Sequence, residues 1–234
     1  MSKTYFVSDL HLFSSRSQEH RYLEQIREKA AEAGQFVLGG DIFDFRWTTM
    51  ATIEATVARA RHWLHELATS CPYCHFHFVM GNHDYHGLFV QAISNLESKL
   101  DNLSWYPHYV RIGNNLFLHG DVIDRRAGIH KMLQRREDHL YREKRGRLAN
   151  QIYDWAIQRN LHKPIVHYSR TKKTVARRIF QYLEAIGHGP HTGVKNVYFG
   201  HTHLAISDYE YKGLLFHNGG APIEGLHFRI IEVR

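Results

Sequence analysis

Residue types that bind metal ions occur in five short motifs along this 234-residue chain. Each motif follows a run of apolar residues and offers carboxylate oxygens, an amide oxygen or imidazole nitrogens, which divalent cations accept as ligands. In chain order the motifs are Asp9-Leu10-His11, Gly40-Asp41, Gly81-Asn82-His83-Asp84, His119-Gly120-Asp121 and Gly200-His201-Thr202-His203. One such motif alone could be an ordinary turn, but a series of five in this arrangement predicts a metal centre.

The apolar runs before these motifs predict the strands that bring the motifs together. The runs are Tyr5–Val7, Phe36–Leu38, Phe76–Met80, Leu116–Leu118 and Val197–Phe199. Proteins of the α/β class place their active sites at the carboxyl ends of successive core strands. We therefore expect all five motifs to meet at one edge of a sheet and to form a site for two metal ions.

Apolar residues at helical spacing between the predicted strands indicate an α/β layered domain. The helical patterns lie near residues 22–30, 53–67 and 88–100. The additional predicted strands are Trp105–Arg111, Leu214–His217 and His227–Val233. A chain of this length can bury one core, whereas two independent domains would be cramped. A single domain that spans residues 1–234 is therefore expected.

Between the fourth and fifth motifs, residues 122–195 contain no convincing strand but three helical patterns. The patterns are Ile129/Met132/Leu133/Leu140, Leu148/Ile152/Trp155 and Val175/Ile179/Tyr182/Ile186. Residues 121–195 carry 17 Lys and Arg against 7 Asp and Glu, although the whole chain has a net charge of only +7. We interpret residues 122–195 as a basic helical insertion, or cap, over or beside the metal site, with Arg125 and Arg126 as candidate substrate-binding residues.

The ordered motifs D-x-H, G-D, G-N-H-D, H-G-D and G-H-x-H resemble those of the calcineurin-like metallophosphoesterase family, from residue 9 to residue 203. The resemblance implies an α/β fold with a layered β-sandwich core flanked by helices, in four layers (αββα), and a dinuclear metal-dependent phosphoesterase activity. The segment 40–47 (GDIFDFRW) and the chain length further resemble the branch of UDP-2,3-diacylglucosamine pyrophosphohydrolases, which act in lipid A biosynthesis. A phosphate- or pyrophosphate-containing small molecule or lipid is then the expected substrate.

The family resemblance also implies how the ligands divide between two divalent metal ions. One ion would be held by Asp9, His11, Asp41 and His203, and the other by Asp41, Asn82, His119 and His201. Asp41 would bridge, because a carboxylate can bind both ions and lower their repulsion. A mixed nitrogen and oxygen set suits Mn, Fe, Zn or Co better than Ca or Mg, and the diacylglucosamine branch favours manganese. Two ions about 3.5–4 Å apart can share a hydroxide that attacks phosphorus and can stabilise the leaving oxygen.

The remaining motif residues have roles that the resemblance also supplies. His83 would contact the substrate phosphate or protonate the leaving group, and Asn82 beside it is both a ligand and a catalytic candidate. Asp44, shortly after the second motif, would orient the His83 ring. Asp84 and Asp121 are expected to stabilise turns or to support the ligands rather than to bind metal.

The hydropathy of the chain and its cysteine pair indicate the cellular compartment in which the protein is expected. The chain has no apolar run of about 18 residues, the length that would predict a membrane-spanning helix. The residues before the first predicted strand lack a signal peptide's apolar stretch, so a cytoplasmic protein is expected. Cys71-Pro72-Tyr73-Cys74 matches the glutaredoxin redox motif, but it follows a predicted helix instead of starting one. We interpret it as a connector with two ordinary thiols.

The basic insertion fits more than one substrate class. For a UDP-linked lipid sugar, it would contact the pyrophosphate and an anionic membrane surface at the inner face of the membrane. The alternative substrate is a nucleotide, a cyclic nucleotide or a single-stranded nucleic acid, because aromatic residues that can stack on bases interleave the basic ones. These aromatic residues are Tyr141, Tyr153, Trp155 and Tyr168. A third hypothesis, a non-catalytic scaffold on the same fold, is disfavoured because every motif position is filled.

Overall fold

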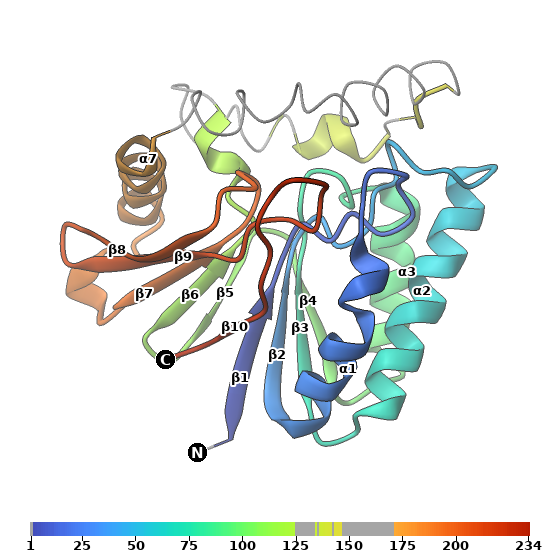
Figure 1. The fold of residues 1–234 in the computed structure, drawn as a ribbon, viewed down its shortest axis with the longest axis horizontal. Coiled ribbons are helices and arrows are strands. Elements are labelled where there is room, and N and C mark those ends of the chain that lie inside the picture. Colours follow the sequence, from blue (N-terminus) through green and yellow to red (C-terminus); the bar gives the residue numbers. More distant parts are fainter. Residues whose placement is uncertain (1, 125–133, 135, 142, 147–170) are drawn as a thin grey trace.

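The computed structural model describes residues 2–124, 134, 136–141, 143–146 and 171–234. The strands within these ranges form two five-stranded sheets (Figure 1). The first sheet has the strand order β10-β1-β2-β3-β4, and the second has the order β5-β6-β7-β9-β8. The sheets face each other, and helices cover the outer face of each sheet (Figure 1).

The first sheet contains three of the strands that lead into motifs. Its strands are β1 (Lys3–Val7), β2 (Ala33–Gly39), β3 (His75–Val79), β4 (Leu103–Tyr106) and β10 (Ile231–Glu232). Strands β1 to β4 run parallel, and β10 pairs with β1 in the antiparallel direction. Because β1, β2 and β3 point the same way, the residues that follow them lie at the same end of the sheet.

Three helices cover the outer face of the first sheet: α1 (Leu23–Glu32), α2 (Ile53–Ser70) and α3 (Gly87–Glu97). Side chains alternate between the two faces of a strand, so every second residue, such as Tyr5, Phe36 or Phe76, points toward these helices. The helices contribute residues at helical spacing, among them Leu64 and Ile93. Amphipathic helices that follow parallel strands thus build the core on this side.

The second sheet carries the other two strands that lead into motifs. Its strands are β5 (Tyr109–Ile112), β6 (Asn115–Leu118), β7 (Asn196–Phe199), β8 (Ile206–Tyr211) and β9 (Leu214–Asn218). Strands β6, β7 and β9 run parallel, while β5 and β8 are antiparallel to their neighbours. Helix α7 (Lys172–Ala185) packs on the outer face through buried residues such as Val175, Ile179 and Leu183.

A small aromatic core joins the inner faces of the two sheets. Phe6 and Val37 come from the first sheet, and Phe117 and Tyr198 come from the second. The ring centroid of Phe6 lies 5.9 Å from that of Phe117 and 5.8 Å from that of Tyr198. With the helices outside, this inter-sheet core completes four layers in the order αββα, so the predicted fold class is confirmed.

One predicted strand, Trp105–Arg111, is wrong as a single element. Strand β4 ends at Tyr106 in the first sheet, and β5 begins at Tyr109 in the second. Pro107 lies in the break, and proline lacks the backbone N–H that a paired strand needs. The chain crosses between the two sheets at this point. The predicted strand His227–Val233 is likewise reduced to the short β10.

The segment 122–195 contributes to the layers of the fold. The short 3₁₀ helix η2 (Asp121–Asp124) lies at its start and η3 (Pro190–Thr192) lies near its end. A further 3₁₀ helix, η1 (Glu19–Arg21), precedes α1. The second helical pattern of the segment lies outside the described residues. The third pattern is α7, which forms the outer layer of the second sheet. Among the residues that the structure describes, no helix has the length and apolar character needed to cross a bilayer.

Candidate metal centre

All five motifs lie at the same end of the two sheets, directly after strands. Asp9, Asp41 and Asn82 come after β1, β2 and β3, and His119 and His201 come after β6 and β7. Strands β1, β2 and β3 run upward in Figure 1, and the loops that follow them lie above the first sheet. The convergence expected from the sequence is therefore present, but the ends of both sheets form it, rather than the edge of one sheet.

Most of the candidate ligands have an unusual backbone conformation. The φ angle is positive at Asp9 (54°), His11 (49°), Asp41 (52°), His201 (65°) and His203 (56°). Residues other than glycine rarely adopt this left-handed region, and each one costs on the order of 1–3 kcal/mol. Such strain persists where the surrounding structure imposes it, and it clusters at functional sites. The tight turns after the strands therefore carry these side chains at a local energetic cost.

Asp9, His11 and His203 form the first group of candidate ligands. One donor atom from each residue lies within 4.8 Å of the donor atoms of the other two. The Nε2 atoms of His11 and His203 are 3.1 Å apart, and Nε2 of His203 is 3.5 Å from Oδ1 of Asp9. Two ring nitrogens that face each other beside a carboxylate form a donor set suited to a transition-metal cation.

Asp41, His119 and His201 form the second group, again with donor atoms within 4.8 Å of one another. The Nε2 atom of His119 lies 3.2 Å from Oδ2 of Asp41 and 3.3 Å from Nδ1 of His201. The amide oxygen of Asn82 adds a fourth donor, 3.1 Å from the same His119 atom and 2.9 Å from the same His201 atom. The second group therefore also combines nitrogen and oxygen donors.

The Asp41 carboxylate lies between the two groups. Its Oδ2 atom is 3.2 Å from Nε2 of His119 in the second group and 4.0 Å from Nε2 of His11 in the first. Burial raises the pKa of Asp9 to about 6, with the Asp41 carboxylate adding to the effect and His119 opposing it. The buried carboxylates of Asp9 and Asp41 favour bound positive charge. The residues present therefore fit a pair of divalent ions that share Asp41.

His83 lies beside the first group, and Asp44 holds its ring. Nδ1 of His83 is 2.9 Å from Oδ1 of Asp44, and the backbone N–H of His83 donates to Asp41 at 2.7 Å. The rings of His83 and His11 meet edge to face, with centroids 4.9 Å apart. The His83 side chain is 16% exposed, whereas Asp44 is fully buried. An oriented ring with one open side is suited to contact a substrate.

Arg16 belongs to this network, although the sequence analysis missed it. Its buried guanidinium pairs with Oδ2 of Asp44 and lies 2.9 Å from Nδ1 of His11. Burial by itself would raise the pKa of the Asp44 carboxyl, but His83 and Arg16 hold that pKa well below its usual range. Asp44 therefore stays ionised and can accept hydrogen bonds from the rings of His11 and His83.

Two other motif carboxylates support the loops, as expected. Asp84 accepts hydrogen bonds from the backbone N–H of Gly81 at 2.6 Å and from that of Ile42 at 2.9 Å, so it ties the third motif to the second. Burial, with the Asp41 carboxylate nearby, raises the pKa of Asp84 to about 7. Asp121 instead forms a two-point ion pair with Arg136, at 2.7 and 3.0 Å.

Asp124 is a further supporting residue that the sequence analysis missed. Its Oδ1 atom lies 2.9 Å from Nε2 of His201, on the opposite side of the ring from the second group. A carboxylate behind a metal-binding histidine fixes the tautomer and raises the basicity of the ring. No motif marked Asp124, Arg16 or Arg136. The predicted substrate-binding residues Arg125 and Arg126 lie outside the described residues.

The chain is similar in sequence to two bacterial proteins that share one name. The chain is 29% identical over 128 residues to a UDP-2,3-diacylglucosamine hydrolase of Pasteurella multocida, a match that covers 53% of this chain and 50% of the relative. It is 27% identical over 221 residues to the protein of the same name from Haemophilus ducreyi, covering 90% and 88% of the two chains. The first match thus spans half the length of that relative.

A dimetal phosphatase from Danio rerio, a solved structure, aligns with 95% of this chain and 88% of its own at 13% identity and a TM-score of 0.48. The family model for calcineurin-like phosphoesterases matches residues 2–205, a range that contains all five motifs. Members of this family use two divalent metals. The chain belongs to the calcineurin-like phosphoesterase family and is a metal-dependent phosphoesterase.

Proposed function

We propose that this enzyme hydrolyses the pyrophosphate bond of UDP-2,3-diacylglucosamine or of a closely similar nucleotide-linked lipid sugar. The names of the two bacterial relatives support this substrate class, as does the resemblance of residues 40–47 to that branch. The observation that carries the proposal is the clustering of nitrogen and oxygen donors at the ends of β1, β2, β3, β6 and β7.

In this proposal two divalent ions, most favourably manganese, bind in the centre. One ion would be held by Asp9, His11, Asp41 and His203, and the other by Asp41, Asn82, His119 and His201. Bound there, the ions supply Lewis acidity that activates water and neutralises charge on phosphoryl oxygens. Asp9 and Asp41 are buried carboxylates and remain the only anionic members of the two ligand sets.

The chain's own residues orient the substrate and handle the proton. His83 contacts the substrate phosphate or donates a proton to the leaving oxygen, because Asp44 on Nδ1 leaves Nε2 for the substrate. The ionised Asp44 accepts a hydrogen bond from Nδ1 and so fixes the orientation of that ring. Asn82 turns its amide oxygen toward His119 and His201, which leaves the amide N–H groups as donors to a phosphoryl oxygen.

Positive side chains beside this network favour an anionic substrate. The guanidinium groups of Arg46 and Arg145 lie 5.6 and 5.9 Å from the ring centroid of Trp47. The backbone N–H of Trp47 donates to Asp44 at 2.9 Å, so the residue that these charges contact is bonded to the partner of His83. A lipid-linked substrate lies at an anionic membrane surface, which basic residues near the site would contact. We therefore expect the enzyme to work in the cytoplasm, at the inner face of the membrane.

A nucleotide, a cyclic nucleotide or a single-stranded nucleic acid is the second candidate substrate class. Tyr141 is 84% exposed and lies in the basic segment, near Arg145 in the sequence. Exposed aromatic rings beside basic residues bind bases by stacking and bind phosphates by charge. This class predicts a strong dependence of oligonucleotide binding on salt concentration, whereas the lipid substrate predicts cleavage in detergent.

The test is a substrate screen with the enzyme reconstituted in manganese, and with zinc and cobalt for comparison. UDP-2,3-diacylglucosamine in detergent should be cleaved in preference to cyclic nucleotides and short DNA. Asp41→Ala should lose both activity and bound metal, while Asp101→Ala, an exposed carboxylate before β4, should retain both. If wild-type protein with excess manganese hydrolyses no phosphomonoester, diester or pyrophosphate, the proposal is wrong.

A further inference from the structure

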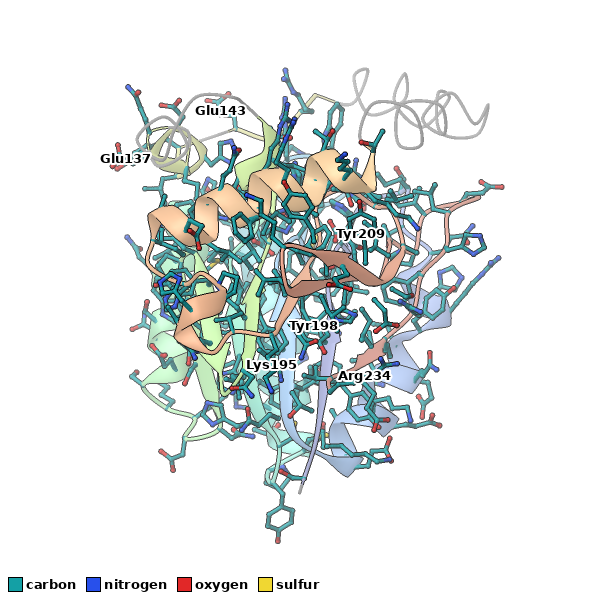
Figure 2. All side chains as sticks on the ribbon, turned by 90° about the vertical axis from the view of Figure 1, so that its left-hand side faces the viewer. Glu137, Glu143, Lys195, Tyr198, Tyr209 and Arg234 are labelled. Atoms are coloured by element: carbon teal, nitrogen blue, oxygen red, sulfur yellow. The ribbon has the colours of Figure 1, made fainter. Side chains whose placement is uncertain are left out.

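The segment that follows η2 makes hydrogen bonds to the loops that carry the motifs. Its described residues, 134, 136–141 and 143–146, lie above the ends of the strands in Figure 1. Most of its side chains face solvent, and Figure 2 shows Glu137 at the outside of the molecule. Arg136 is the exception, because its side chain is buried among the loops.

The Arg136 guanidinium uses all of its nitrogen atoms in contacts with these loops. Nε donates to Oδ2 of Asp121 at 3.0 Å, and Nη2 donates to Oδ1 at 2.7 Å. Nη2 also donates to the carbonyl of Met80 at 3.2 Å, and Nη1 donates to the carbonyl of Pro107. The group lies over the ring of Tyr85, 5.7 Å from its centroid. Such planar, multidentate bonding fixes both the position and the angle of its partners.

The partners of Arg136 are close in sequence to two of the candidate ligands. Asp121 is two residues after His119, and Met80 is two residues before Asn82. The His119 ring and the Asn82 amide oxygen are 3.1 Å apart in the second group. One guanidinium therefore joins the two loops whose side chains must meet to complete that group.

The first group is fixed by other contacts. The backbone N–H of Asp9 donates to the carbonyl of Gly40 at 3.0 Å, and that of His11 donates to the carbonyl of Asp41 at 2.9 Å. The Arg16 guanidinium and Asp44 hold the His11 ring from behind, at 2.9 and 3.2 Å from Nδ1. Within the described part of the chain, the hydrogen bonds that Arg136 makes with motif loops are to Asp121 and Met80, on the loops that carry His119 and Asn82. Its hydrogen bond to the carbonyl of Pro107 lies instead between β4 and β5.

The same segment is attached at three further points. The backbone N–H of Gly87 donates to the carbonyl of Leu140 at 2.9 Å, and a side chain at Gly87 would lie only 3.3 Å from that carbonyl oxygen. The backbone N–H of Arg145 donates to the carbonyl of Arg46 at 2.8 Å, and the Lys144 ammonium donates to the carbonyl of Met50 at 2.9 Å. These bonds hold the segment against the loops, so the backbone from which the Arg136 side chain extends has a fixed position.

We propose that Arg136 is a positioning residue for the second group of ligands alone. Through Arg136, this segment positions the ligands of one of the two metal ions. The inference rests on the proposed two-metal function. Arg136 touches none of the candidate donor atoms and acts through Asp121 and the Met80 carbonyl. Removal of a residue that supports a metal ligand typically lowers metal affinity by about 10–100-fold.

The experiment measures manganese binding to wild type, Arg136→Met and Arg136→Lys by calorimetric titration and elemental analysis. Wild type should bind two ions. Arg136→Met should bind one ion with wild-type affinity and the second about 10–100-fold more weakly. Electron paramagnetic resonance should then show an isolated Mn(II) signal at one equivalent and a reduced signal from the magnetically coupled pair at two. Arg136→Lys should restore only part of the affinity, because one ammonium cannot span both partners.

Glu137→Gln, an exposed change on the same segment, is the matched control and should bind as wild type does. If Arg136→Met does not fold, Arg136→Met/Asp121→Asn removes both buried charges and should show the same selective loss. Two ions bound with wild-type affinities, or an equal weakening of both, overturns the role of Arg136. Wild-type protein that binds fewer than two ions would instead overturn the proposed function itself.

Discussion

Replacement of Arg16 by methionine should destabilise the protein strongly at neutral pH, because it leaves a buried carboxylate without its cation. The Arg16 side chain is 4% exposed and that of Asp44 is 0% exposed. Removing one partner of a buried ion pair typically costs about 3–5 kcal/mol. We expect about 3 kcal/mol, the lower end of that range, because the backbone N–H of Trp47 and the His83 ring still bond to Asp44.

The size of this loss depends on pH. Burial opposes ionisation of Asp44, yet His83 and Arg16 hold its pKa well below the usual range. A carboxyl whose pKa is lowered by folding contributes stability above its unfolded pKa of about 4, and this contribution is lost as the pH falls through the folded pKa. The difference in unfolding free energy between wild type and Arg16→Met should therefore be complete at neutral pH and shrink below about pH 4.

The assay is urea denaturation of both proteins in a chelator, so that bound metal does not contribute to the measured stability. A loss of about 3 kcal/mol corresponds to a fall in Tm of about 6–12 °C for a chain of this size. Arg16→Met/Asp44→Asn removes the charge of both partners and should be less destabilised than Arg16→Met. Arg111→Met, at an exposed arginine of β5, is the control. A loss below about 1 kcal/mol at neutral pH, or a double variant as unstable as the single one, would show that Arg16 does not compensate the buried charge of Asp44.

Three other measurements address separate parts of the molecule. His83→Ala should lower kcat by about 10²–10⁴-fold yet keep two bound ions, and loss of metal from this variant would instead indicate a ligand role. Burial, with the Cys71 thiol nearby, raises the pKa of Cys74 to about 12, so iodoacetamide should modify Cys74 only after unfolding. Rapid modification of the native protein, seen by mass spectrometry, would contradict its burial. Phe43→Ala should lower the unfolding free energy by about 3–5 kcal/mol, because the ring is fully buried among aromatic residues of the first core. A loss below about 1 kcal/mol in denaturation would contradict that packing.

The strands of the centre and the positions of its candidate ligands could be predicted because their signals are local. Each motif directly follows its strand, so the run Phe36–Leu38 and the next polar residues already place Asp41 at a strand end. The parallel direction of β1, β2 and β3 then brings Asp9 and Asn82 to the same side. The break at Pro107 was missed because the residues on both sides of it have strand-like composition, and only the tertiary fold assigns them to different sheets.

The supporting residues could not be predicted because their partners are distant in sequence. Arg16 reaches Asp44 across 28 residues, Arg136 reaches Met80 across 56, and Asp124 reaches His201 across 77. No spacing within one strand or helix marks such a contact. Helix α7 shows the same limit, since its apolar pattern predicted a helix but could not show that this helix covers the second sheet.

In the proposed centre, side chains from both sheets bind two cations on either side of one carboxylate. Anomalous diffraction from crystals grown with manganese tests it most directly. We expect two peaks, one among Asp9, His11 and His203 and the other among Asn82, His119 and His201, with Asp41 in contact with both. A single peak, or peaks away from these side chains, would contradict it.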